Sequence, residues 1–241
     1  MKKILVPSLI ALALGTVSGL AQAQAAAAPA PESSLSFNVG AVSDYRYRGI
    51  SQSRLKPAVQ GGLDYADKSG LYVGAWGSSI KWIKDTPDVT SGSSELDLYG
   101  GYKGAVGDLA YDVGVLRYVY AGNDYANYGV NANTTEVYGA ATFGVFTVKY
   151  SRATTSLFGN PESKGSYYID MGATFDLGNG YAFAPHVGYQ KVKNVVDASY
   201  TDYSLTLSKD LREGLNRRRS NPSSLREKYW RRPIGGSCAR L

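Results

Sequence analysis

The chain contains a single histidine, His186, and two polar residues, Asp170 and Ser204, fall on the same predicted strand face. A serine, a histidine and an aspartate brought together in space would make a hydrolase. No G-x-S-x-G motif accompanies them, and a polar side chain facing the interior of a β-barrel explains His186 better. We therefore predict no enzymatic activity, and a lipid hydrolase acting through His186 is the least favoured alternative.

Metal and cofactor chemistry finds little support in the residue types present. One histidine and the lone cysteine, Cys238, cannot supply the ligands of a zinc site. No glycine-rich phosphate-binding motif occurs, because the glycines are scattered among strand-like segments. We expect neither a metal nor a cofactor.

Charged residues recur opposite apolar ones in the strand-like segments, and this places them on one common face. Asp44, Arg46 and Arg48 share the polar face of the first segment, where they would either line a constriction or form a structural ion-pair network. Nine of the expected interior side chains are acidic and three are basic, which predicts a weak preference for cations if a pore exists. The full set predicted to line the interior is Asp44, Arg46, Arg48, Asp64, Glu95, Asp97, Asp112, Glu136, Lys149, Asp170, Asp176, His186 and Asp202.

Ten segments carry this alternation, and the gaps between them are short and long in turn. This double alternation is typical of an antiparallel up-and-down transmembrane β-barrel, with short turns at one rim and longer loops at the other. We expect all-β structure, an interruption at Pro185 and an even strand number, twelve in an intact relative. The segments lie near residues 35–48, 58–66, 71–82, 95–102, 109–115, 135–143, 146–151, 167–176, 181–190 and 202–207.

Aromatic residues are the second mark of a membrane barrel. The chain has 20 tyrosines, and many fall on the apolar strand faces, as in the aromatic girdles at the rims of such barrels. The alternative is the aromatic core of a soluble sandwich. The residues predicted to face lipid are Tyr45, Tyr47, Tyr65, Tyr72, Trp76, Tyr102, Tyr111, Tyr150, Tyr167, Tyr181 and Tyr189.

The two ends of the chain differ from its body. Residues 1–23 have a basic start, a short apolar run and a small-x-small site, which predicts a secretory signal peptide and export to the bacterial outer membrane. A small-residue linker (24–34) and the barrel (35–211) follow. Residues 211–241 hold eight Arg and one Lys against two Glu, without strand-like alternation. We interpret 212–241 as a basic tail outside the barrel, frameshifted or disordered, and expect no nucleic-acid partner.

The chain contains the segments SDYRYRGISQ (43–52), KPAVQGGLDY (56–65) and SGLYVGAW (69–76). Together they resemble the TorF-type porin family of proteobacterial outer membranes, and the likeness is looser onward to about residue 211. The resemblance implies an outer-membrane barrel and a diffusion channel without established catalytic residues. The basic tail departs from the family pattern, in which the chain ends on a membrane strand with a terminal aromatic residue.

The function expected from these observations is passive diffusion of small hydrophilic solutes across the outer membrane. The alternative is a barrel that does not conduct and acts as a structural or surface-interaction protein through its long loops. Membrane lipid and small solutes are the expected partners. The sequence names neither the solute nor the oligomeric state.

Overall fold

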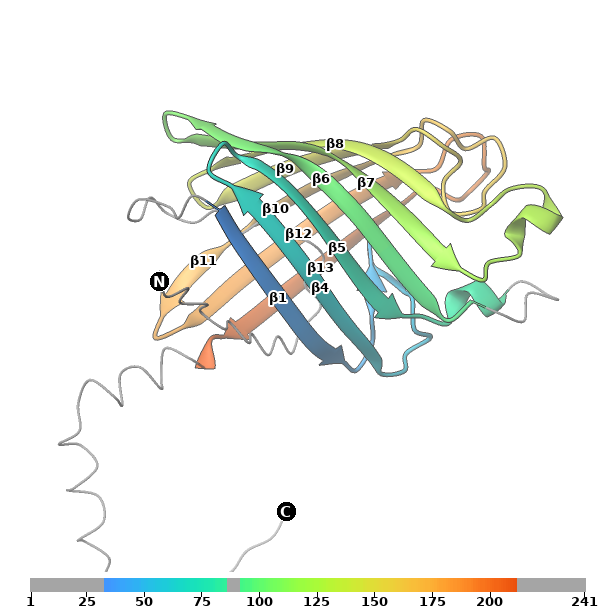
Figure 1. Ribbon diagram of the computed structural model, residues 1–241, viewed down its shortest axis with the longest axis horizontal. Coiled ribbons are helices and arrows are strands. Elements are labelled where there is room, and N and C mark those ends of the chain that lie inside the picture. The colour runs from blue at the N-terminus through green and yellow to red at the C-terminus, as the bar shows by residue number, and fades with distance from the viewer. Residues whose placement is uncertain (1–32, 86–91, 212–241) are drawn as a thin grey trace, which may run out of the picture.

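The computed structural model describes residues 33–85 and 92–211. Every strand pair is antiparallel, and the large sheet has the order β1-β4-β5-β6-β7-β8-β9-β10-β12, with β11 and β13 also paired to β12 (Figure 1). The predicted all-β antiparallel fold is confirmed. The elements are β1 (Ser33–Val42), β2 (Arg46–Tyr47), β3 (Ile50–Ser51), β4 (Ala58–Asp67), β5 (Leu71–Ser79), η1 (Trp82–Asp85), β6 (Ser94–Val106), β7 (Leu109–Ala121), η2 (Tyr125–Tyr128), β8 (Thr134–Phe143), β9 (Phe146–Ala153), β10 (Tyr167–Ala173), β11 (Phe175–Gly178), β12 (Tyr181–Lys191) and β13 (Tyr200–Lys209).

The predicted signal peptide (1–23), most of the linker (24–34) and the basic tail (212–241) lie outside the described residues. Among the residues that are described, no helix has the length and apolar composition needed to cross a membrane.

The connections between long strands alternate between the two ends of the sheet. Residues 68–70, 107–108, 144–145 and 179–180 form tight turns at one end, which we call the turn end. Asn179 and Gly180 have φ angles of 53° and 77°, the left-handed pair that a type I′ hairpin turn requires. The opposite end, the loop end, carries residues 43–57, 80–85, 92–93, 122–133, 154–166 and 192–199. The predicted order of short and long connections is present throughout the described strands.

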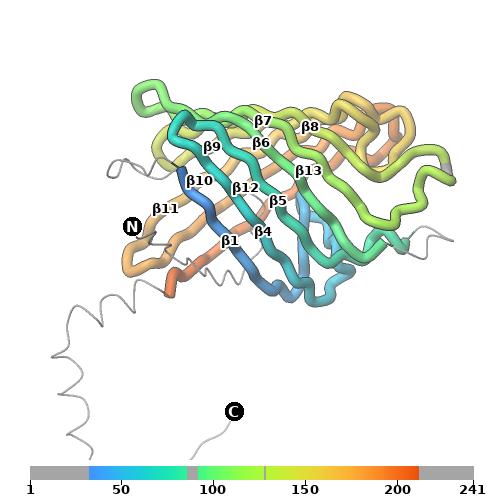
Figure 2. Tube along the Cα trace, in the orientation of Figure 1, coloured from blue at the N-terminus to red at the C-terminus, as the bar shows by residue number. Residues whose placement is uncertain are grey.

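The sheet curls around an interior, as the ribbon and the tube show (Figures 1 and 2). Its outer face is apolar: Val113, Val115 and Val148 on β7 and β9 are exposed. The residues between them along each strand, such as Asp112 and Lys149, lie on the inner face, because successive side chains of a strand point to opposite sides. Apolar side chains therefore face outward and polar ones inward, the reverse of a soluble protein.

The two edge strands do not pair with each other. Within the described residues, β1 is hydrogen-bonded to β4 alone and β13 to β12 alone, so the sheet has an open seam. Two outward side chains of β13, Tyr203 at 83% and Leu205 at 74%, are the most exposed large hydrophobic residues on the strands.

Pro185 lies in β12, and the interruption occurs in the neighbouring strand rather than in β12 itself. β12 runs through Pro185, but β10 ends at Ala173 and β11 begins at Phe175, with the same register against β12 on both sides. That register places Ala173 opposite Pro185, which has no N–H to donate to the ladder. The single strand predicted over 167–176 is therefore two strands.

The strand predicted over residues 35–48 is wrong beyond residue 42. The chain leaves the sheet after Val42, and residues 43–57, which we call the arm, fold inward with the short β2–β3 hairpin. Arg48 and Gly49 make the hairpin turn with φ angles of 46° and 78°. The Ser53 hydroxyl accepts a hydrogen bond from the Tyr45 amide at 3.0 Å, so side-chain bonding here replaces the strand ladder.

Candidate functional site

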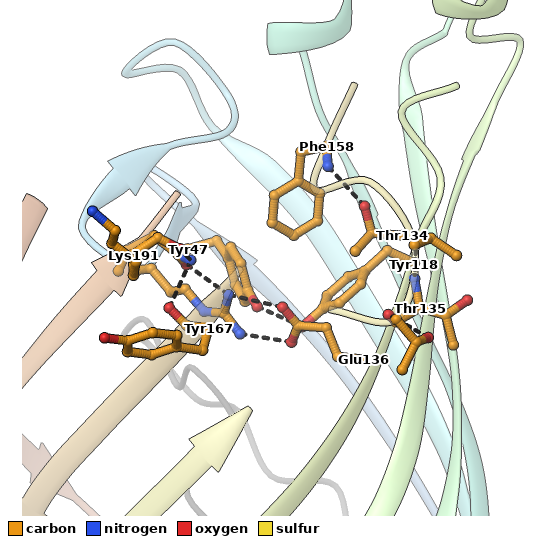
Figure 3. A network of polar contacts seen from close by, with 12 residues as sticks. Tyr47, Tyr118, Thr134, Thr135, Glu136, Phe158, Tyr167 and Lys191 are labelled. Carbon is orange, nitrogen blue, oxygen red and sulfur yellow. Dashed lines mark hydrogen bonds and ion pairs between the residues drawn. The ribbon is translucent and has the colours of Figure 1, made fainter. Parts of the chain in front are cut away.

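The arm is fastened to the inside of the sheet by one buried arginine. Arg48 donates two hydrogen bonds to the Glu136 carboxylate on β8, from Nη1 at 2.9 Å and from Nη2 at 2.7 Å. Its Nη1 also donates to Oε1 of Gln190 on β12 at 2.7 Å. Only 7% of Arg48 and 1% of Glu136 are exposed. We call this arrangement the clasp, and it links strands that are far apart in the sheet order (Figure 3).

Aromatic rings enclose the clasp. The Arg48 guanidinium lies 4.8 Å from the ring centroid of Tyr47 and 4.4 Å from that of Tyr168. The Tyr118 hydroxyl donates to Glu136 at 3.2 Å, and Phe158 from the loop 154–166 packs edge-on against Tyr118 (Figure 3). Burial lowers the pKa of Arg48, but the Glu136 carboxylate and the neighbouring tyrosines raise it by more, so the pKa lies well above its ordinary value. The guanidinium therefore stays charged in its pocket.

Asp44 fixes the base of the arm. Its carboxylate accepts hydrogen bonds from the hydroxyls of Ser51, at 2.5 Å, and Ser53, at 3.2 Å. Arg46 pairs with the same carboxylate at 2.8 Å, and half of the Arg46 side chain is exposed. Burial raises the pKa of Asp44, but the Ser51 hydrogen bond, the Arg46 charge and the Ser53 bond together lower it below its ordinary value.

Two carboxylates on β6 lie beside the clasp without enough partners. Glu95 is 2% exposed and accepts one hydrogen bond from the Tyr120 hydroxyl at 3.4 Å. Its Oε2 atom and Oδ1 of Asp97 are buried with no hydrogen-bond partner among the described residues. Buried carboxylate oxygens normally have a hydrogen-bond partner, so these two atoms are exceptions within the described interior.

Tyrosine hydroxyls and lysine ammonium groups occupy the inner face nearer the turn end. Tyr72 donates to Asp112 at 2.6 Å and also contacts the Tyr138 hydroxyl, and Tyr99 donates to Asp64 at 2.5 Å. The Lys103 ammonium lies 4.6 Å from the Tyr72 ring centroid.

The ammonium of Lys149 lies 4.0 Å from the ring centroid of Tyr138 on the neighbouring strand. Cation–π contact and tyrosine hydrogen bonds thus stabilise charges that have no ion pair with another described residue.

His186 lies between two carboxylates on the inner face of β12. Its Nε2 is 3.4 Å from Asp170 and its Nδ1 is 3.7 Å from Asp202, while Tyr168 donates to Asp202 at 2.9 Å. Ser204 is the cross-strand neighbour of His186, but both ring nitrogens face carboxylates. The arrangement is a polar cluster of one histidine, two aspartates and a tyrosine, and it lacks the serine–histidine hydrogen bond of a hydrolase. No group of His, Cys, Asp and Glu in the described ranges could hold a metal ion.

The structure brings most of the predicted interior residues onto one face and displaces four. Asp44, Arg46 and Arg48 lie on the arm, and the strand predicted to hold them ends at Val42. Asp176 is exposed at the turn end, where it accepts a hydrogen bond from the Gly178 amide at 2.7 Å. The other nine lie on the inner face, as their alternate positions along the strands or their contacts indicate. They are Asp64, Glu95, Asp97, Asp112, Glu136, Lys149, Asp170, His186 and Asp202.

Four aromatic residues predicted to face lipid point inward. Tyr45 and Tyr47 belong to the arm, Tyr72 bonds Asp112, and Trp76 packs against Tyr45 with ring centroids 5.4 Å apart. Tyr118, Tyr138 and Tyr168 were not predicted as interior residues. Tyr118 lies six residues after Asp112 on β7, and Tyr138 lies two residues after Glu136 on β8. Because residues an even number apart on a strand face the same side, the two-residue period predicts that both tyrosines face inward.

A family model described as a bacterial protein of unknown function, Gcw_chp, matches residues 25–219. No curated protein and no solved structure matches the chain.

Proposed function

The chain belongs to the Gcw_chp family, and we propose that it is an outer-membrane β-barrel with a narrow interior path for small hydrophilic solutes, cations in preference to anions. The observation that carries this proposal is the inverted distribution of side chains. Apolar residues cover the outside of a curled sheet, and the inner face carries charges, hydroxyls and glycines.

The outer surface supports a lipid environment. Phe37, Val73 and Val148 lie on three different strands and expose 62%, 58% and 47% of their surface. Soluble monomers rarely expose a continuous apolar surface across a whole sheet, because its contact with water is unfavourable. In a bilayer the same surface is favourable, provided that the edges of β1 and β13 are hydrogen-bonded. The proposal therefore requires the open seam to close in the membrane.

The interior supports cation preference and a narrow path. Carboxylates outnumber cationic side chains on the inner face of the described strands, and the Arg48 guanidinium is paired with Glu136. A pore lined in this way lowers the energy of cations relative to anions. The arm and its aromatic neighbours pack across the interior at the loop end, which limits the size of any solute that passes.

A second candidate is a barrel that does not conduct and acts through its loop end. The clasp favours it, because Arg48 joins the arm to β8 and β12 by three hydrogen bonds across the interior. Under this alternative the ion-pair network is structural, and the folded loops form an interaction surface.

Planar-bilayer recording of the purified full-length protein in a KCl gradient tests the proposal. We expect small conductance steps and a reversal potential of the sign that cation permeation gives. A reversal potential of the opposite sign would refute the cation preference. Silent bilayers that contain correctly inserted protein would favour the second candidate, and protein extracted from membranes by urea would refute both.

A further inference from the structure

A basic pocket opens at the loop end of the sheet, separate from the interior. Its volume is about 710 Å³, and it is lined by three cationic side chains, Arg152, Lys164 and Lys193, and by one carboxylate, Glu162. Pockets of this size accommodate a small ligand or a lipid head group. Among the described residues, none of the three cations forms an ion pair. Net positive charge in an open pocket favours an anionic ligand.

Backbone bonds hold the walls of the pocket in place. The Gly165 amide donates to the Ala153 carbonyl at 2.9 Å, which ties loop 154–166 to the end of β9. The Lys193 amide donates to the Ser166 hydroxyl at 2.9 Å, which ties loop 192–199 to the same loop. The pocket is therefore preorganised by two loops and one strand.

Gly165 is the point where two of the cations converge. It has a φ of 86°, and a Cβ atom built on it would lie 3.6 Å from Nη2 of Arg152 and 3.8 Å from Cδ of Lys193. Both side chains therefore come within van der Waals reach of this backbone position. The guanidinium and the lysine stem consequently border a common space.

A row of tyrosines lies immediately beside this pocket on the outer face. Tyr167 pairs across strands with Arg152 on one side and Lys191 on the other. Its ring centroid lies 5.6 Å from that of Tyr150 and 6.4 Å from that of Tyr189. Tyrosine rows on membrane barrels lie at the level of lipid head groups, with apolar residues such as Val148 and Met171 on the side of the acyl chains.

We propose that this pocket binds the phosphate-bearing head group of a lipid in the leaflet that faces the loop end. The inference rests on the proposed membrane location of the barrel. Arg152 and Lys193 contact the phosphate, Lys164 adds charge at the rim, and the tyrosine row fixes the depth at which the lipid meets the protein. A soluble phosphate compound has the same charge but gains nothing from the neighbouring apolar surface.

The test measures binding of diphosphoryl lipid A to the full chain in dodecyl maltoside micelles by native mass spectrometry. Removing two cations in Arg152→Gln/Lys193→Gln should weaken binding roughly 30-fold, from the usual contribution of a basic residue near an anionic lipid. The matched control Lys56→Gln/Lys84→Gln removes two exposed cations elsewhere at the loop end and should bind as the wild type does. The charge-preserving Arg152→Lys/Lys193→Arg variant should retain most of the binding and shows that the pocket folds.

The outcomes separate the sources of the ligand and the two proposals. Equal affinity of the wild type and Arg152→Gln/Lys193→Gln would overturn the site, as would displacement of the lipid by inorganic phosphate at an equal phosphate concentration. If the wild type inserts into vesicles but Arg152→Gln/Lys193→Gln binds lipid A as tightly as the wild type does, the lipid site is contradicted and the proposed function is not. Protein that does not insert contradicts the proposed function.

Discussion

Replacing Arg48 by methionine perturbs the clasp while nearly preserving side-chain volume. The substitution removes three hydrogen bonds and leaves the Glu136 carboxylate, which is 1% exposed, without its counter-charge. Breaking a buried pair in this way costs about 3–5 kcal/mol of folding free energy. We expect Arg48→Met to lose stability by that amount and to free the arm from the inner face.

Arg54 provides the matched control. It lies on the same arm and has a left-handed φ of 54°, close to the 46° of Arg48, so backbone strain is similar in the two residues. Arg54 pairs with Asp85, but 44% and 56% of these side chains are exposed. Exposed pairs contribute about 0–1 kcal/mol, so Arg54→Met should be nearly neutral.

The assay is urea unfolding of the full chain in detergent micelles, followed by fluorescence and by the gel mobility of the folded form. A double-mutant cycle with Glu136→Gln isolates the coupling between the two residues. Arg48→Met/Glu136→Gln should be more stable than Arg48→Met, because both charges are removed together. An Arg48→Met protein within about 1 kcal/mol of the wild type, which is the exposed-pair value, would refute the clasp. A double variant no more stable than Arg48→Met would also refute it.

Three further perturbations test other parts of the interior. Asp112→Asn/Asp170→Asn should move the reversal potential in a KCl gradient toward zero, because both carboxylates are partly exposed on the inner face; an unchanged value would mean that these carboxylates do not set selectivity. Gly101→Ala should cost about 1–3 kcal/mol in urea unfolding, because its Cβ would lie 2.3 Å from the Val113 carbonyl oxygen. Gly139→Ala, whose nearest contact is 3.9 Å away, should be tolerated, and equal effects of the two would contradict the packing. The pKa of Asp44 in the folded protein is lower than its ordinary value of 3.8. The carboxylate therefore contributes fully to anchoring the arm above pH 3.8, and this contribution is lost as the pH falls through the lower pKa of the folded state. A spin label at Leu55→Cys in a Cys238→Ala background should therefore become more mobile in acid, and it should be mobile at all pH values when Asp44→Asn is added.

The alternation of apolar and polar residues was sufficient to predict the long strands and their connections. In β9, Val148 and Lys149 fall on opposite faces as the two-residue period requires. The arm could not be predicted in this way, because residues 43–48 alternate as a strand does. What removes them from the sheet is hydrogen bonding by Asp44, Ser51 and Ser53, which depends on contacts up to nine residues apart.

The partners in the interior were harder to predict than its strand faces. Glu136 was predicted to face inward, but its pairing with Arg48 spans 88 residues and requires the curl of the whole sheet. Tyr72 was placed on the lipid side because segment 71–82 is apolar on both faces, and a large ring gives no sign of its direction. The basic pocket was missed because Arg152, Lys164 and Lys193 lie on separate elements.

Cysteine labelling along β9 in lipid vesicles tests the inside-out arrangement most directly. Single cysteines would be placed in turn at positions 146–151 in a Cys238→Ala background and exposed to a charged, water-soluble thiol reagent. We predict a two-residue period, with labelling at 147 and 149, protection at 146, 148 and 150, and no labelling at position 151, where Ser151 is only 3% exposed. Uniform labelling, or protection of the inner positions with labelling of the outer ones, would contradict it.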